Sequence, residues 1–135
     1  MKYKSLHGYK YEVMEEYTLP VMLPSSLAVP EPYVCIKNGY LIIKKYYAWD
    51  GPSGPSFDTK TFMRGSLVHD ALYQLMREET LSKDYKDYAD NLLRTICLED
   101  GMSPFRAWYV YQAVHIFGQG SLKLEKKPRG LIVEV

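Results

Sequence analysis

Proline placement limits what this chain can form. Six of its eight prolines lie between residues 20 and 55, and "LPVMLPSSLAVPEP" (19–32) alone contains four of them. Because proline lacks a backbone N–H and clashes with the preceding turn, that stretch must be extended or looped. We therefore predict that residues 1–48 are rich in β-strand. The Gly, Pro and Ser residues of "WDGPSGPSFD" (49–58) predict a structured loop.

A two-residue turn is encoded inside the β-rich segment. In "YVCIKNGYLIIKKYY" (33–47), two runs of strand-forming residues flank the dipeptide Asn38-Gly39. Asn-Gly is the strongest short-range hairpin signal, because both residues tolerate the positive φ angles that such a turn requires. We predict an antiparallel β-hairpin here.

Three segments after residue 58 carry apolar residues at helical spacing. The first is expected to begin near Asp58 or Thr59 and to end near residue 79. The second follows Ser82 and ends near residue 99, where Gly101 stops it. Pro104 opens the third at its first turn, since the missing N–H is unpaired there in any case.

The third helix is expected to end at "GQG" (118–120), interpreted as a helix stop, and "RGLIVEV" (129–135) is expected to add a short strand. The short connection "TLSKD" (80–84) favours an antiparallel pair of the first two helices. The expected fold is a single α+β domain, with a β-hairpin-rich N-terminal third, the antiparallel helix pair and a third helix. Its expected parts are 1–48 (β-rich), 49–58 (loop), 59–118 (helical) and 119–135 (tail).

Composition restricts the classes of partner. The net charge of +1 offers no electrostatic reason to bind nucleic acid, so no nucleic-acid partner is expected. The opening residues, "MKYKSLHGYKYEV", lack the apolar stretch of a secretory signal, and the longest apolar runs are far shorter than a membrane span. Cys35 and Cys97 are too few for a disulfide framework; they are expected to be buried thiols, with one disulfide between them left open.

Two polar residues interrupt the apolar run "SLVHDALYQ" (66–74), namely His69 and Asp70. Burial of either group is costly unless it has a partner. Asp90 likewise interrupts the apolar face of the second helix, and antiparallel packing would bring it to His69. A carboxylate on one imidazole nitrogen fixes the tautomer and leaves the other nitrogen free to act as a base.

The loop before the first helix offers a partner for Asp70. It contains Asp50 and backbone carbonyls around Gly51, and carboxylate and carbonyl oxygens are the ligands that Ca²⁺ prefers. A cation there would neutralise both aspartates and polarise a substrate carbonyl beside a water held by His69.

The motif "HDALY" (69–73) is similar to the His-Asp-x-x-Tyr helix of the secreted calcium-dependent phospholipases, the phospholipase A2 superfamily. The similarity extends to "DG" in the preceding loop and to an aspartate on the following helix. It implies that His69 is the general base, Asp90 its orienting partner and Tyr73 a hydroxyl that supports Asp90. It further implies a helix pair like that of these enzymes.

The same resemblance implies a calcium site and a substrate. Asp70 would bind Ca²⁺ together with Asp50 and the backbone of Gly51, and the substrate would be a phospholipid or another ester at a membrane surface. The sequence departs from the family in two places. "DGPSGPS" (50–56) replaces the glycine-rich calcium loop, and the disulfides that flank the His-Asp pair in the animal enzymes are missing.

The wider pattern "WDGPSG…HDALY…AD…AV..FG" resembles a family of uncharacterised proteins encoded by tailed phages and prophages. This resemblance implies a viral origin. The lack of a secretory signal then predicts synthesis in the cytoplasm of a bacterial host, and virion association or release at lysis is open. It implies no established activity, and any phage or host protein partner is open.

Two hypotheses follow. The first is a phage-encoded, calcium-dependent ester hydrolase in which His69 and Asp90 activate water. The second is a non-catalytic virion or accessory protein that retains the fold, in which the polar groups only fix helix packing. Under either hypothesis His115, on the third helix beside Tyr111, is expected to be a core or rim residue rather than a ligand.

Overall fold

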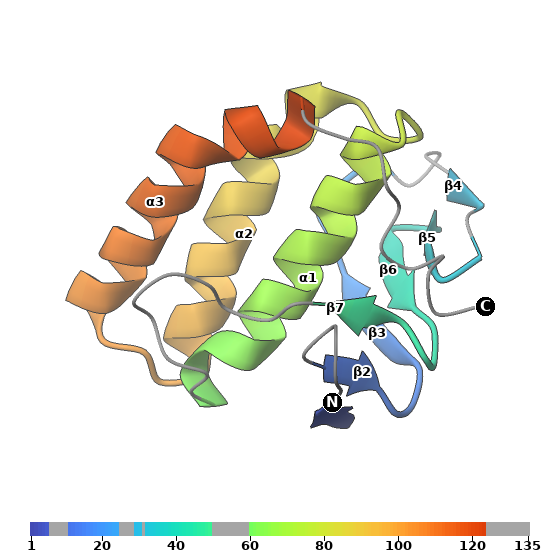
Figure 1. The fold of residues 1–135 in the computed structure, drawn as a ribbon, viewed down its shortest axis with the longest axis horizontal. Coiled ribbons are helices and arrows are strands. Elements are labelled where there is room, and N and C mark those ends of the chain that lie inside the picture. Colours follow the sequence, from blue (N-terminus) through green and yellow to red (C-terminus); the bar gives the residue numbers. More distant parts are fainter. Residues whose placement is uncertain (6–10, 25–28, 31, 50–59, 124–135) are drawn as a thin grey trace. The chain divides into compact units, whose positions relative to one another are not determined.

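The structure is a computed structural model, and it describes residues 1–5, 11–24, 29–30, 32–49 and 60–123 (Figure 1). The chain divides into two compact units, whose described parts lie within residues 1–49 and 60–123. The first unit is built of strands and the second of helices, which confirms the α+β class. That residues 1–135 form one domain stays a prediction. The predicted strand at 129–135 lies outside the described residues.

The N-terminal unit contains two antiparallel sheets. The first has the order β1-β2-β7, with the strands β1 (Tyr3–Ser5), β2 (Tyr11–Val13) and β7 (Ala48–Trp49). The second has the order β3-β6-β5-β4, with the strands β3 (Tyr17–Pro20), β6 (Tyr40–Ile43), β5 (Val34–Lys37) and β4 (Val29–Pro30). The N-terminal third is thus rich in strands, as predicted.

The predicted hairpin is formed by β5 and β6. Asn38 and Gly39 connect the strands with φ angles of 53° and 80°, the positive values that a two-residue turn of this twist needs. The turn pairs Lys37 with Tyr40, and this register places Ile36 opposite Leu41 on the buried face. The predicted hairpin is therefore confirmed, and its two-residue turn sets the register of the two strands.

The helical unit contains α1 (Lys60–Arg77), the short 3-10 helix η1 (Lys83–Tyr85), α2 (Lys86–Glu99) and α3 (Pro104–Lys123). Ser82 caps η1, since its hydroxyl accepts a hydrogen bond from the Asp84 N–H at 3.1 Å. Gly101, with a φ of 100°, terminates α2. The three predicted helices are therefore present, and the predicted cap at residues 58–59 lies outside the described part of the chain.

The helices α1 and α2 are antiparallel neighbours. Gly65, early in α1, lies against Cys97 late in α2, whereas Tyr73, late in α1, contacts Asp90 early in α2. A Cβ at residue 65 would lie only 2.9 Å from a methyl group of Leu93, so glycine permits the close approach. The two helices run side by side in Figure 1, in green and yellow.

The helix α3 completes the unit by covering α2. A buried cluster joins residues of all three helices and the α2–α3 connection: Phe62, Leu93, Cys97, Met102, Ala107 and Val110. Both cysteines are free thiols in this structure; Cys97 is buried, as expected, whereas Cys35 is only partly buried. Burial raises the pKa of the Cys97 thiol to about 12. No helix within the described residues is long and apolar enough to cross a membrane.

The predicted helix stop at 118–120 is wrong. The helix α3 continues through this segment to Lys123, so the first five residues of the predicted tail are helical. Gly118 does not have the positive φ of a terminating glycine. It lies instead against Tyr73 of α1, where a Cβ would overlap the tyrosine hydroxyl. This glycine serves close packing between helices rather than termination.

Candidate functional site

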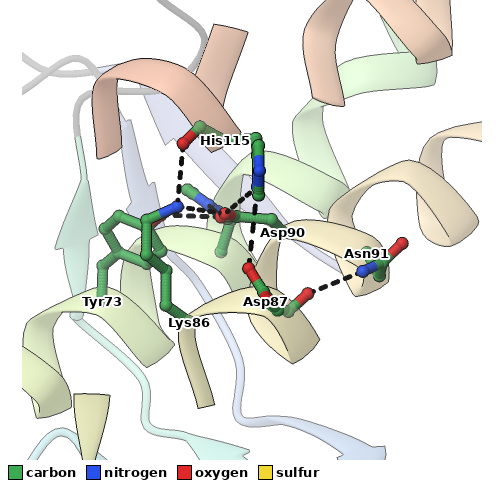
Figure 2. A network of polar contacts seen from close by, with 7 residues as sticks. Tyr73, Lys86, Asp87, Asp90, Asn91 and His115 are labelled. Atoms are coloured by element: carbon green, nitrogen blue, oxygen red, sulfur yellow. Dashed lines mark hydrogen bonds and ion pairs between the residues drawn. The ribbon is translucent and has the colours of Figure 1, made fainter. Parts of the chain in front are cut away.

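Asp90 is the centre of a buried polar network between α1 and α2. Its side chain has 0% exposure, more complete burial than the partial burial expected from the sequence. On Oδ1 it accepts hydrogen bonds from His69 Nε2 at 2.8 Å and from the Tyr73 hydroxyl at 2.7 Å. On Oδ2 it accepts one from the ammonium of Lys86 at 2.7 Å, a contact shown in Figure 2. The predicted catalytic residues are therefore brought together.

Helix periodicity explains this convergence. His69 and Tyr73 are four residues apart on α1, so both side chains project from the face that packs on α2. Lys86 and Asp90 have the same spacing on α2 and share its inner face. Four residues from two helices thus meet at one carboxylate.

The hydrogen bonds define the charge of Asp90. Burial alone would raise the pKa of its carboxyl group, but the hydrogen bonds from His69, Lys86 and Tyr73 together lower the pKa below the ordinary 3.8. The group is therefore a carboxylate at neutral pH, and a carboxylate can only accept hydrogen bonds.

This charge state determines the tautomer of neutral His69. Since Asp90 Oδ1 can only accept, Nε2 must carry the ring proton and donate it, which leaves a lone pair on Nδ1. Nδ1 has no hydrogen-bond partner among the described residues. The ring also packs on that of Tyr73, with 4.1 Å between the centroids. An oriented imidazole with a free lone pair is equipped to take a proton from a water molecule.

Tyr73 is a neutral donor in this network. Burial, followed by its hydrogen bond to Asp90, raises the pKa of the phenol far above its usual range. The hydroxyl also lies against Gly118 of α3, where a Cβ would overlap it. Tyr73 therefore supports Asp90, the role that the sequence resemblance implied.

Lys86 is the member of the network that sequence reasoning missed. It is 8% exposed, and its ammonium binds the main-chain carbonyl of His115 at 3.1 Å as well as Asp90 (Figure 2). It therefore links α3 to the carboxylate. A sequence signal did exist, because Lys86 lies four residues before an aspartate on an apolar helix face.

His115 lies at the edge of the network, as expected for a rim residue. Its side chain is 44% exposed and stacks on the Tyr111 ring, with 5.4 Å between the centroids. Its Nδ1 lies 3.6 Å from Asp87 Oδ1 and 4.0 Å from Asp90 Oδ2, and one atom from each of the three residues lies within 4.8 Å of the others. Such a group could hold a cation, but the Lys86 ammonium already neutralises Asp90 and would repel one. We interpret Asp87 and His115 as the rim of the polar network around Asp90.

The predicted calcium ligands are only partly described. Asp70 lies on α1 directly after His69 and is partly exposed. Asp50 and Gly51 lie outside the described residues. The calcium site therefore stays a prediction.

Comparisons with protein-family models, with curated proteins and with solved structures find no match. The resemblances to phospholipases and to phage proteins therefore stay predictions.

Proposed function

We propose that this protein is an ester hydrolase in which His69 is the general base and Asp90 orients it. One observation supports the proposal above the others. The buried, ionised carboxylate of Asp90 accepts a hydrogen bond from Nε2–H, which leaves the lone pair of His69 on Nδ1, the atom that would take a proton from water.

The proposed reaction needs no covalent intermediate on the protein. His69 Nδ1 takes a proton from water as the water oxygen attacks the carbonyl carbon of the ester. The tetrahedral intermediate then collapses, and the imidazolium returns the proton to the departing alkoxide, which leaves an acid and an alcohol. Asp90 stabilises the transient imidazolium through the 2.8 Å hydrogen bond.

We further propose that the substrate is a phospholipid ester and that Ca²⁺ assists. The "HDALY" motif supports this choice, and Asp70, the partly exposed residue after the proposed base, offers a carboxylate, the type of ligand that Ca²⁺ prefers. Asp70, Asp50 and the Gly51 carbonyl would hold the ion, which would polarise the ester carbonyl when bound.

A non-catalytic virion or accessory protein is the second candidate function, and one contact favours it. Lys86 pairs with the buried Asp90 carboxylate at 2.7 Å, so this charge is satisfied within the protein without any catalytic role. A network of this kind also suits a structural role, in which it specifies how the helices pack.

Hydrolysis of fluorogenic phospholipid vesicles distinguishes the two functions. The assay compares wild type, His69→Gln and the control His7→Gln, each with Ca²⁺ and with EGTA, after circular dichroism has shown that all three fold. We expect calcium-dependent release that His69→Gln abolishes and His7→Gln retains. Absence of release from wild type, without any calcium-induced change in melting temperature, would favour the structural protein. Release that persists in His69→Gln would exclude His69 as the base.

A further inference from the structure

We propose that Lys86 is a positioning residue of this site. Its ammonium holds Asp90 Oδ2, so that Oδ1 faces His69 and accepts the hydrogen bond from Nε2–H. This inference rests on the proposed function and concerns a residue that acts through Asp90. It follows from the geometry of the carboxylate, from the charge balance and from the contacts of α3.

The geometry comes first. The two oxygens of Asp90 are used differently: Oδ1 accepts from His69 and Tyr73, and Oδ2 accepts from Lys86. The terminal torsion of an aspartate is broad, so donors rather than rotamer preference set its carboxylate plane. Without the ammonium, the buried Oδ2 would lack its 2.7 Å donor, and the carboxylate would be free to rotate toward the donors on α1.

The charge balance gives the second reason. Lys86 supplies the formal positive charge that lies closest to Asp90, while His115 Nδ1 approaches Oδ2 only to 4.0 Å and also faces Asp87. An uncompensated buried carboxylate favours protonation. A protonated Asp90 could donate to His69 Nε2, which would move the ring proton to Nδ1 and remove the lone pair that the mechanism needs.

The third reason is the link to α3. Lys86 binds the carbonyl of His115, and Tyr73 lies against Gly118. The helix α3 therefore contacts both of the residues that, besides His69, donate hydrogen bonds to Asp90. The orientation of the carboxylate therefore depends on the packing of α3 through Lys86.

Three variants test the proposal: Lys86→Met, Lys86→Arg and the matched control Lys83→Met on the exposed η1 segment. The main measurement is ¹⁵N NMR of the imidazole nitrogens of His69, at a pH above the ordinary imidazole range. It needs no hydrolysis, so it separates a failure of this inference from a failure of the proposed function. Vesicle hydrolysis and thermal melting are measured on the same samples.

We expect wild type, Lys86→Arg and Lys83→Met to hold His69 as the Nε2–H tautomer. In Lys86→Met we expect a mixture of tautomers, and kcat should fall on the order of 10- to 100-fold with little change in KM, the usual cost of losing an orienting partner. If Lys86→Met does not fold, Lys86→Gln replaces it, with the same expected loss of the single tautomer.

Two results would overturn the proposal. If the variant without the ammonium keeps the Nε2–H tautomer and loses only melting temperature, Lys86 is merely structural. If wild type itself shows the Nδ1–H tautomer, the assigned direction of the His69–Asp90 hydrogen bond is wrong, and no variant is needed to show it.

Discussion

A carboxylate with 0% exposure, such as Asp90, loses hydration worth several kcal/mol unless neighbouring groups replace the water. The Lys86 ammonium, the His69 ring N–H and the Tyr73 hydroxyl do so here, at 2.7 to 2.8 Å. The removal of any one donor therefore destabilises the network, because it leaves a buried charge or a buried oxygen less well satisfied.

The Tyr73 hydroxyl gives a direct measure of this dependence. We expect Tyr73→Phe to lower the free energy of unfolding by about 1.5–3 kcal/mol, the range for a hydrogen bond to a charged group. The ring that packs on His69 is retained, so the loss reports on the hydroxyl. Urea denaturation measures it, with the exposed Tyr109→Phe as control, expected to change stability by less than about 0.5 kcal/mol. An equal effect of the two substitutions would contradict the role of the hydroxyl.

At this scale the sequence predicted the pairing of His69 with Asp90 but not the part played by Lys86. Helical spacing and the short connection between α1 and α2 were enough to bring the histidine to the aspartate. A lysine one turn before an aspartate is ordinarily an exposed partner on the helix surface. Its burial depends on α3, whose packing position no local pattern encodes.

At the scale of elements, close approach between helices depends on glycine. Gly65 brings α1 to the Leu93 and Cys97 side chains of α2, and Gly118 brings α3 to Tyr73 of α1. Both glycines are in helices, where glycine costs about 1 kcal/mol relative to alanine. Glycine is therefore favoured over alanine at these two positions only if a Cβ would collide with the neighbouring helix.

Gly118→Ala tests this argument. We expect a loss of about 1–3 kcal/mol in the free energy of unfolding, because the new Cβ overlaps the Tyr73 hydroxyl and forces a shift. In the double variant with Tyr73→Phe the overlapping atom is absent, so the combined loss should be smaller than the sum of the single losses. A double-mutant cycle by urea denaturation measures the coupling. A stabilised Gly118→Ala, as helix propensity alone predicts, would contradict the close contact.

The same glycine explains why one element boundary was not predictable. A glycine after a run of helical spacing usually marks a helix end, because that position needs a positive φ. Gly101 follows the rule, with a φ of 100°, whereas Gly118 continues the helix. The turn at Asn38-Gly39 was predictable because its requirement is local, while the requirement at Gly118 comes from a tyrosine 45 positions earlier in the chain.

At the scale of the whole molecule, the α+β class followed from two local rules. Prolines and β-rich runs indicated strands in the N-terminal third, and apolar residues at helical spacing indicated the three helices. The proposed catalytic residues belong to the helical unit, whereas the proposed calcium ligands divide between α1 and residues 50–51, outside the described part of the chain. Distances therefore support the contacts of His69, and the calcium site stays a prediction.

Acid titration connects the buried network to the stability of the whole molecule. The pKa of Asp90 is lower in the folded protein than the ordinary 3.8, so between the two values the unfolded chain binds more protons. The contribution of Asp90 is thus complete above about pH 4 and is lost as the pH falls through the folded pKa.

We expect Asp90→Asn to lower the free energy of unfolding near pH 7 by about 3–5 kcal/mol, because it leaves the Lys86 ammonium buried without its anion. Urea denaturation of both proteins between about pH 2 and pH 7 isolates this carboxylate, since other acidic groups contribute equally to each. The difference between wild type and variant should stay constant above about pH 4 and shrink on further acidification. If the difference instead grew on acidification, Asp90 would be protonated in the folded protein, because only the unfolded chain would then release this proton above about pH 4. The Nε2–H tautomer of His69, and with it the proposed base, would then lose its physical cause.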